Sequence, residues 1–195
     1  MPFGIGLMAT LLLAWVIFRV IVRRDYLRGG SLSLLSTGLE FLIFGLHANL
    51  PYLYLETPWP LFPPLPNNRF QIILGFLVAT AGLLTTLAIM AQLSYRITVG
   101  SKPPQLRRTG LYRWSRNPQL LSYGLMLGGC VILYPSWQAI AWLVLYGAIA
   151  LLMVQTEEEH LHNLFGAEFE DYCRQTPRFF PLPGKGGILF ERPKD

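Results

Sequence analysis

From residue 119 to residue 156 the chain reads QLLSYGLMLGGCVILYPSWQAIAWLVLYGAIALLMVQT, with no Asp, Glu, Lys or Arg. The hydrocarbon core of a bilayer takes roughly 20 apolar residues in a helix, so residues 137–156 are long enough to cross it. Residues 119–134 form a shorter apolar segment that contains Gly124, Gly128 and Gly129, which suits a helix packed closely against its neighbours. We therefore predict a tight hairpin of two membrane helices that turns at Tyr134-Pro135-Ser136.

The rest of the chain repeats this apolar pattern. Hydrophobic residues make up 52% of the 195 residues and charged residues only 14%, against about 25% charged in soluble domains. Further apolar stretches cover residues 3–22, 32–53 and 72–93. No basic residue precedes the first of them and no small-residue cleavage site follows it, so we expect a retained span and not a signal peptide. The predicted fold is all-α, a polytopic membrane helix bundle of about five transmembrane helices.

The positions of Lys and Arg predict the orientation of the bundle. If the segments after the first, third and last spans face the cytoplasm, they hold all 16 basic residues except Arg69. Cytoplasmic loops carry the excess of Lys and Arg, so we expect the N-terminus outside and the C-terminus inside. The net charge of +5 then reflects topology and attraction to anionic lipid, and no nucleic acid is needed as a partner.

An acidic run, Thr156-Glu-Glu-Glu159, follows the last span. Thr156 as N-cap with Glu159 three residues later is a capping box, and apolar residues recur at helical spacing as far as Tyr172. This predicts an amphipathic cytoplasmic helix that begins at residue 157 and lies against the membrane or folds back on the bundle. We expect His160 and His162 to be surface groups on it and not catalytic bases.

Two polar groups interrupt the apolar stretch 32–53. Glu40 and His47 lie two turns apart on one helix face, about 10 Å by helical rise, so each requires a partner from another span or from water. Polar packing contacts and a polar entrance for a substrate are both compatible with this pattern. Cys130 lies within a predicted span and Cys173 on the cytoplasmic side, and neither shows a metal-ligand spacing, so we expect neither a disulfide nor a metal site.

The polar segments that flank the hairpin contain an ordered set of motif residues. Gly110, Tyr112, Arg116, Asn117 and Pro118 precede it; Glu157, Glu158, Leu161, Phe165, Gly166, Phe169 and Tyr172 follow it, and Arg178 and Pro181 close the pattern. Over about the last 90 residues this pattern resembles the integral-membrane methyltransferases that include isoprenylcysteine carboxyl methyltransferase and the phospholipid N-methyltransferases. The resemblance implies S-adenosylmethionine as cofactor and a lipid or lipidated, isoprenylcysteine-like, acceptor.

The resemblance also implies a site. Its cofactor-binding residues would be Leu106, Tyr112, Asn117, Pro118, Gln119, Leu120 and Glu157, and the residues serving the reaction directly would be Arg116, Glu158 and Arg178. A carboxylate such as Glu157 can accept hydrogen bonds from two ribose hydroxyls or balance a positive centre. Arg116 can pair with the carboxylate of the cofactor, with Glu157 or Glu158, or with phosphate head groups.

The chain departs from the family pattern at Leu120, where Tyr is usual, at Ser122, where Gly is usual, and at Met153, where carboxyl methyltransferases have Arg. Loss of that Arg removes a charge-assisted partner for an acceptor carboxylate, which argues against a prenylcysteine acceptor unless Arg178 replaces it. Two alternative functions remain. Glu159-His160, Phe165-Gly166, Tyr172-Cys173 and Pro177 are similar to a pattern in NADPH-dependent membrane sterol reductases, and Met153 is compatible with a catalytically degenerate scaffold.

We expect one membrane domain, 1–195, whose oligomeric state the sequence does not specify. Its predicted parts are a three-helix part (1–95), a cytoplasmic cofactor loop (96–118), the helical hairpin (119–156), the amphipathic helix with its cap (157–181) and a tail (182–195).

Overall fold

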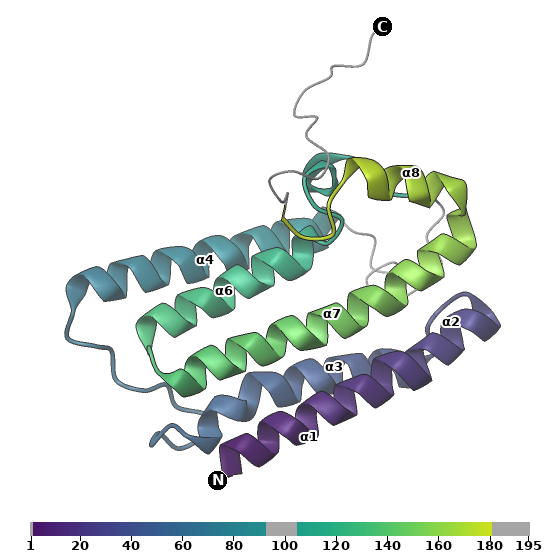
Figure 1. The fold of residues 1–195 in the computed structure, drawn as a ribbon. Helices are drawn as coiled ribbons and strands as arrows, with labels where there is room; N and C mark the ends of the chain where they lie inside the picture. Colours follow the sequence, from purple (N-terminus) through teal and green to yellow (C-terminus); the bar gives the residue numbers. More distant parts are fainter. Residues whose placement is uncertain (1, 93–104, 181–195) are drawn as a thin grey trace, which may run out of the picture.

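Helices make up the framework of the protein (Figure 1). The structure, a computed structural model, describes residues 2–92 and 105–180, and within these ranges it contains no β-strand. The all-α fold class predicted from the sequence is therefore confirmed. Arg96, Lys102, Pro181, Lys185, Arg192, Lys194 and the predicted tail 182–195 lie outside the described residues.

The N-terminal part is a long helix followed by a shorter one that packs beside it. Helix α1 (Pro2–Val16) continues through a π-helical turn, η1 (Ile17–Val22), into α2 (Arg23–Gly29). Gly30, with φ of 64°, ends the helix, because this left-handed conformation costs glycine little. Ser33 then caps α3 (Leu34–Asn49) by accepting a hydrogen bond from the Ser36 backbone N–H at 3.2 Å.

A second pair of helices packs so closely at two glycines that a side chain at either position would clash with the facing backbone. After the 3₁₀ turn η2 (Leu50–Leu53) and a loop come α4 (Arg69–Gln92), the 3₁₀ turn η3 (Gly110–Arg113) and α6 (Pro118–Leu133). Helices α4 and α6 lie side by side (Figure 1). A Cβ added to Gly82 would lie 2.3 Å from the Met126 backbone N, and one added to Gly129 would lie 2.4 Å from the Ala79 backbone N. The predicted close packing of the segment 119–134 is confirmed.

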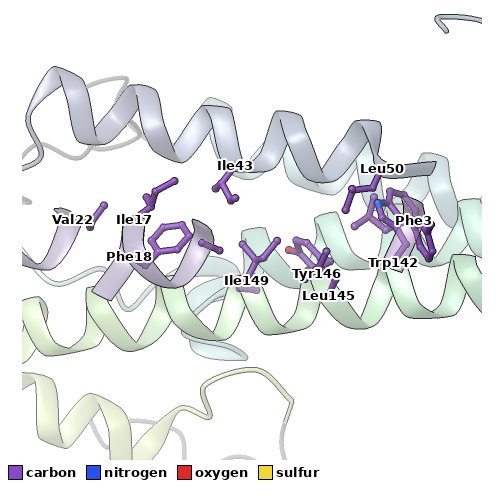
Figure 2. Close-up of a cluster of buried hydrophobic side chains, with 13 residues drawn as sticks. Phe3, Ile17, Phe18, Val22, Ile43, Leu50, Trp142, Leu145, Tyr146 and Ile149 are labelled. Carbon is purple, nitrogen blue, oxygen red and sulfur yellow. The ribbon is translucent and has the colours of Figure 1, made fainter. Parts of the chain in front are cut away.

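Helix α7 (Trp137–Phe165) connects the two parts and leads to α8 (Ala167–Gln175). The predicted turn at 134–136 is confirmed, and Ser136 caps α7 by accepting from the Ala139 backbone N–H at 3.0 Å. Side chains of α1, η1, α3 and α7 fill the core between these helices, among them Phe18, Ile43 and Ile149 (Figure 2). Helix α8 lies across the end of the bundle where α7 ends and α6 begins (Figure 1).

In the part of the chain that the structure describes, three helical stretches are long and apolar enough to cross a membrane: Pro2–Gly29, Arg69–Gln92 and Trp137–Phe165. Large hydrophobic side chains on them face outward, as Leu84 at 60% exposure and Leu77 at 63% illustrate. Lipid tails cover such a surface at no cost, whereas water does not. Helices α3 and α6 have 16 residues each, fewer than the roughly 20 that a simple crossing takes.

One predicted helix boundary is wrong. Thr156 is not an N-cap, since α7 runs without a break from Trp137 to Phe165 and the next helix begins at Ala167. The Thr156 hydroxyl lies 3.0 Å from the Leu152 carbonyl one turn earlier in the same helix. Glu is a good helix former, so an acidic run does not interrupt a helix that packing already holds, and Gly166 makes the break instead.

Candidate functional site

The Glu158 carboxylate joins three segments that are distant in the sequence. Glu158 projects from the last part of α7, and its Oε1 atom lies 3.2 Å from Nη1 of Arg116, in the segment before α6. Its Oε2 atom accepts from Nε of Arg178 at 3.0 Å, beyond α8. The side chains of Arg116 and Glu158 are only 13% and 15% exposed. The contact with Arg178 is a charge-assisted hydrogen bond, about twice as strong as a neutral one, and the contact with Arg116 is an ion pair. This carboxylate therefore ties the loop and the C-terminal segment to the bundle.

Backbone carbonyls after α8 brace the same loop. The Arg116 backbone N–H donates to the Pro177 carbonyl at 3.0 Å, and the Asn117 side-chain amide donates to the Arg178 carbonyl at 3.0 Å. The Ser115 hydroxyl lies 3.2 Å from that same Arg178 carbonyl. Pro118 takes the first helical position of α6, where its missing N–H costs nothing. Asn117 therefore precedes a helix start that proline defines, and its side chain binds the C-terminal segment instead of capping the helix.

Helix α8 covers the loop from the other side. The Tyr172 hydroxyl donates to the Tyr112 carbonyl at 2.7 Å, and the Arg108 guanidinium lies 5.8 Å from the centre of the Tyr172 ring. Arg116 also contacts the Cys173 thiol and lies 6.0 Å from the centre of the Phe169 ring. Phe169 and Tyr172 are both buried. The loop 105–118 is thus held between the end of α7, helix α8 and the segment that follows α8.

Three consecutive glutamates of α7 have three different surroundings. Glu158 binds Arg116 and Arg178, as described above. Glu159 accepts two hydrogen bonds of 2.9 Å from Nε of Arg23, and its Oε2 atom lies 3.6 Å from Nη1 of Arg19. Glu157 forms no hydrogen bond or ion pair within residues 2–92 and 105–180. It is the glutamate of this run whose carboxylate no described residue engages.

The surroundings of Glu157 come from both halves of the chain. Glu157 is close enough to Tyr26, Glu40 and Tyr112 to interact with each of them electrostatically. Burial raises the pKa of the Tyr112 phenol, a shift that the positive charge of Arg107 opposes. One carboxylate oxygen of Glu40 is buried and has no hydrogen-bond partner in the described part of the chain. An acidic region with unused acceptor atoms therefore adjoins the braced loop.

The structure brings together most, but not all, of the predicted site residues. Arg116, Asn117, Glu158 and Arg178 form one group joined by hydrogen bonds and an ion pair, and Tyr112 and Glu157 adjoin it. Pro118, Gln119 and Leu120 form the first turn of α6, where the Leu120 carbonyl accepts from the Tyr146 hydroxyl at 2.7 Å. Leu106 is half-buried in the segment before η3. Within the described ranges no hydrogen bond links Leu106 to the group.

Several neighbours of the site were not found by sequence reasoning. Ser115 and Cys173 contact the group directly, and Tyr26 comes from a helix with no motif at all. Ser115 lies two residues before Asn117, and its hydroxyl accepts a hydrogen bond from the Asn117 backbone N–H. A serine at this place in a turn is a sequence signal that could have identified it. Cys173 and Tyr26 carry no sequence signal, because their role depends on tertiary contacts.

Of the two histidines predicted to be surface groups, His162 is exposed and His160 is buried. His162 is exposed and lies 2.9 Å from Oε1 of Glu170, as expected of a surface group. The expectation for His160 is wrong, since it is only 8% exposed and its ring stacks on Tyr26 with ring centres 4.0 Å apart. His47 makes a polar packing contact: its Nε2 lies 3.0 Å from the Trp142 carbonyl, and Trp142 Nε1 donates to the His47 carbonyl at 2.7 Å.

The chemistry available in this group is that of positioning and charge. It offers carboxylates, guanidinium groups and tyrosines, and among the described residues no cluster of three or more His, Cys, Asp or Glu could hold a metal ion. Buried Nε atoms of Arg108 and Arg116 also lack hydrogen-bond partners among the described residues. Such a set can bind a ligand that carries both a positive centre and a carboxylate.

Comparisons with known proteins agree with this picture. The model of the phospholipid methyltransferase family matches residues 70–168, from α4 to the beginning of α8. NccN, a nickel-cobalt-cadmium resistance protein of Alcaligenes xylosoxydans xylosoxydans, is 33% identical over 104 residues, which are 52% of this chain and 49% of that protein. The chain thus matches about half the length of this relative. No solved structure matches.

Proposed function

We propose, from the premise that the chain belongs to the phospholipid methyltransferase family, that it transfers a methyl group from S-adenosylmethionine to a lipid or lipidated acceptor within the membrane. Enzymes of this family are membrane methyltransferases and generally use this cofactor. The observation that carries the proposal is the convergence on Glu158 of Arg116 and Arg178, from segments on either side of the hairpin, beside a Glu157 that remains open.

The residues present fit the cofactor. Glu157 would accept hydrogen bonds from the ribose hydroxyls or face the sulfonium. The adjoining side of the cofactor would be lined by Tyr112, Asn117, Pro118, Gln119 and Leu120, with Leu106 at the edge of the site. The unpartnered Nε atom of Arg116 suits the carboxylate of the amino-acid part. When bound, the cofactor supplies a methyl group that is already activated for transfer.

The protein groups then have to position and enclose the reactants. Glu158 pairs with both Arg116 and Arg178 and would so hold the loop in the geometry that an in-line transfer requires. Helix α8, through Tyr172 and Phe169, covers the loop and excludes water. Arg116, Glu158 and Arg178 thus act mainly by placing the loop, although Arg116 also has an atom free to contact the ligand.

The surroundings favour a neutral or positively charged acceptor group over a carboxylate. Met153, where the carboxyl methyltransferases have Arg, packs against the hydrophobic core. Arg178 is engaged by Glu158, so we do not expect it to replace that Arg. Neither Glu40 nor Glu157 supplies the positive charge that the family Arg gives to an acceptor carboxylate, and either of them would repel that carboxylate when ionised. A phospholipid with an amine head group fits this charge better than a prenylcysteine.

The membrane arrangement that we propose has five crossing helices, with α3 and α6 as the short members and α8 as an amphipathic helix at the cytoplasmic surface. The N-terminus would lie outside, the site and the C-terminus inside. The division into the parts 1–95, 96–118, 119–156, 157–181 and 182–195 is retained as a functional division, although α7 crosses the boundary at residue 156.

A thermal-shift measurement on the purified protein in detergent tests the proposal. A ligand that binds the folded state stabilises it by RT ln(1 + [L]/Kd), about 2.7 kcal/mol at 100-fold excess over Kd. S-adenosylmethionine or its demethylated product should raise the melting temperature of the wild type. Glu157→Gln should lose this gain, while the control Glu170→Gln, an exposed carboxylate on α8, should keep it.

The same measurement separates the alternatives. A gain with NADPH alone would indicate a reductase, and no gain with either ligand would indicate a scaffold. Incubation with methyl-labelled cofactor and lipids then identifies the acceptor. We expect label in an amine-bearing phospholipid, and label in a prenylcysteine analogue alone would contradict the charge argument.

A further inference from the structure

The π-helical turn η1 contacts the part of α7 that carries the site residues. It lies outside the region matched by the family model. Segments with π-type hydrogen bonds are rare, and they occur frequently at functional sites. In η1 the Arg23 backbone N–H donates to the Phe18 carbonyl five residues earlier. The Thr156 hydroxyl lies 3.2 Å from the same Phe18 carbonyl. The irregular turn is therefore in hydrogen-bonding contact with the residue that precedes Glu157.

Arg19, which belongs to the π-helical turn, completes this contact. Its Nη1 donates to the Thr156 hydroxyl at 3.3 Å and lies 3.6 Å from Oε2 of Glu159. A threonine hydroxyl has one hydrogen and two lone pairs, so Thr156 can accept from Arg19 while its hydrogen is shared between the Phe18 and Leu152 carbonyls. Thr156 is only 1% exposed and Phe18 is fully buried. Water does not compete for the bond between the Thr156 hydroxyl and the Phe18 carbonyl.

The contacts occupy one face of α7. Thr156, Glu159 and His160 are at positions i, i+3 and i+4, and so share a face. Thr156 binds η1, Glu159 binds Arg23, and His160 stacks on Tyr26. Successive residues turn by about 100° around a helix, so Glu157 lies on a flank of this face and Glu158 lies nearly opposite to it. Holding the face against η1 and α2 thereby sets the direction in which Glu157 and Glu158 point.

We infer that Thr156, with Arg19 and the Phe18 carbonyl, is a positioning residue for the methyltransferase site. The inference rests on the proposed function where it is tested by binding of S-adenosylmethionine. The π-helical turn fixes the rotation of α7, which keeps Glu158 on Arg116 and Arg178 and presents Glu157 to the cofactor. The N-terminal helix is then a working part of the site and not only a membrane anchor.

The test compares three variants of the full-length protein in detergent. Thr156→Val removes the hydroxyl and keeps the shape, Thr156→Ser keeps the hydroxyl, and Tyr134→Phe removes a comparable hydrogen bond, of 3.0 Å to the Pro63 carbonyl, at the other end of the bundle. The measurements are the dissociation constant for S-adenosylmethionine and the melting temperature without ligand. We expect Thr156→Val to weaken binding by about 3- to 10-fold, the range that one buried hydrogen bond supplies.

Thr156→Ser should bind like the wild type, and so should Tyr134→Phe. Wild-type affinity in Thr156→Val would overturn the inference, and so would a loss in Thr156→Ser as large as that in Thr156→Val. Should Thr156→Val fail to fold, Arg19→Met serves the same comparison. It removes the guanidinium from the Thr156 hydroxyl and should weaken binding in the same way.

A second readout needs no cofactor, so the inference can be judged even if the wild type binds none and the proposed function fails. Cys173 contacts Arg116, which Glu158 holds, so its alkylation by a maleimide reports the geometry on the far side of α7. In a Cys130→Ala background, Thr156→Val should change the rate at Cys173 at least 3-fold, and Tyr134→Phe should not. Equal rates in all variants would show that the π-helical turn does not set the rotation of α7.

Discussion

The contact between α4 and α6 gives a prediction that can be worked out from distances. In Gly129→Ala the new Cβ would lie 2.4 Å from the Ala79 backbone N and 2.7 Å from its Cα and Cβ. Carbon atoms in contact prefer about 3.5 to 4.0 Å, so the helices must separate by about 1 Å, which forfeits up to half of the dispersion energy of the affected pairs. Because backbone atoms cannot rotate away, we expect a loss of about 1–3 kcal/mol in unfolding free energy.

The neighbouring Gly128 is a matched control. No heavy atom lies within 4 Å of a Cβ added there. Alanine is better than glycine in a helix interior by about 0.5–1 kcal/mol, so Gly128→Ala should be neutral or stabilising. Thermal or SDS-induced unfolding in detergent measures both changes: Gly129→Ala should lower the unfolding free energy and Gly128→Ala should not. Equal effects would refute the close packing of α4 on α6, and with it the placement of Asn117 and Gln119 at the site.

Three further predictions concern the braced loop. Glu158→Gln should lower the unfolding free energy by about 2–3 kcal/mol in thermal unfolding, because it removes the charge from a mostly buried pair with Arg116; a loss under about 0.5 kcal/mol, typical of an exposed pair, would contradict this. Tyr172→Phe should lower the unfolding free energy by about 1 kcal/mol in the same assay, because it removes the hydrogen bond to the Tyr112 carbonyl. An unchanged unfolding free energy would show that this bond is not formed. Burial raises the pKa of the Cys173 thiol, although the Arg116 charge opposes the shift. Since the thiolate is the reactive form, maleimide labelling in Cys130→Ala should have its pH midpoint above that of a free thiol, and a midpoint below it would be inconsistent with burial.

Much of the fold could be predicted because a bilayer constrains sequence strongly. The apolar runs, the turn at 134–136 and the small residues on α6 all follow from length and composition. The helix boundary at Thr156 could not be predicted. Thr followed by three Glu is compatible with a helix start, but the Thr156 hydroxyl instead bonds to the Phe18 and Leu152 carbonyls. Only the packing of α1 on α7 decides between these two uses of the same residue.

The candidate site was predicted in part for the same reason. The motif residues Arg116, Asn117, Glu158 and Arg178 lie together, and of the partners considered for Arg116 the structure shows Glu158. The assignment of different partners to Glu157, Glu158 and Glu159 depends on the helix rotation, which the sequence does not specify. The burial of His160 follows from a ring on α2 that no local pattern connects to it.

The central claim is that a cofactor binds beside Glu157 and the loop before α6. Irradiation of the protein with labelled S-adenosylmethionine, followed by mass spectrometry of its peptides, tests this most directly. We predict label within residues 106–120 or at the end of α7 around Glu157, with competition by the demethylated product. Label confined to the N-terminal part, or none that the product displaces, would contradict the account.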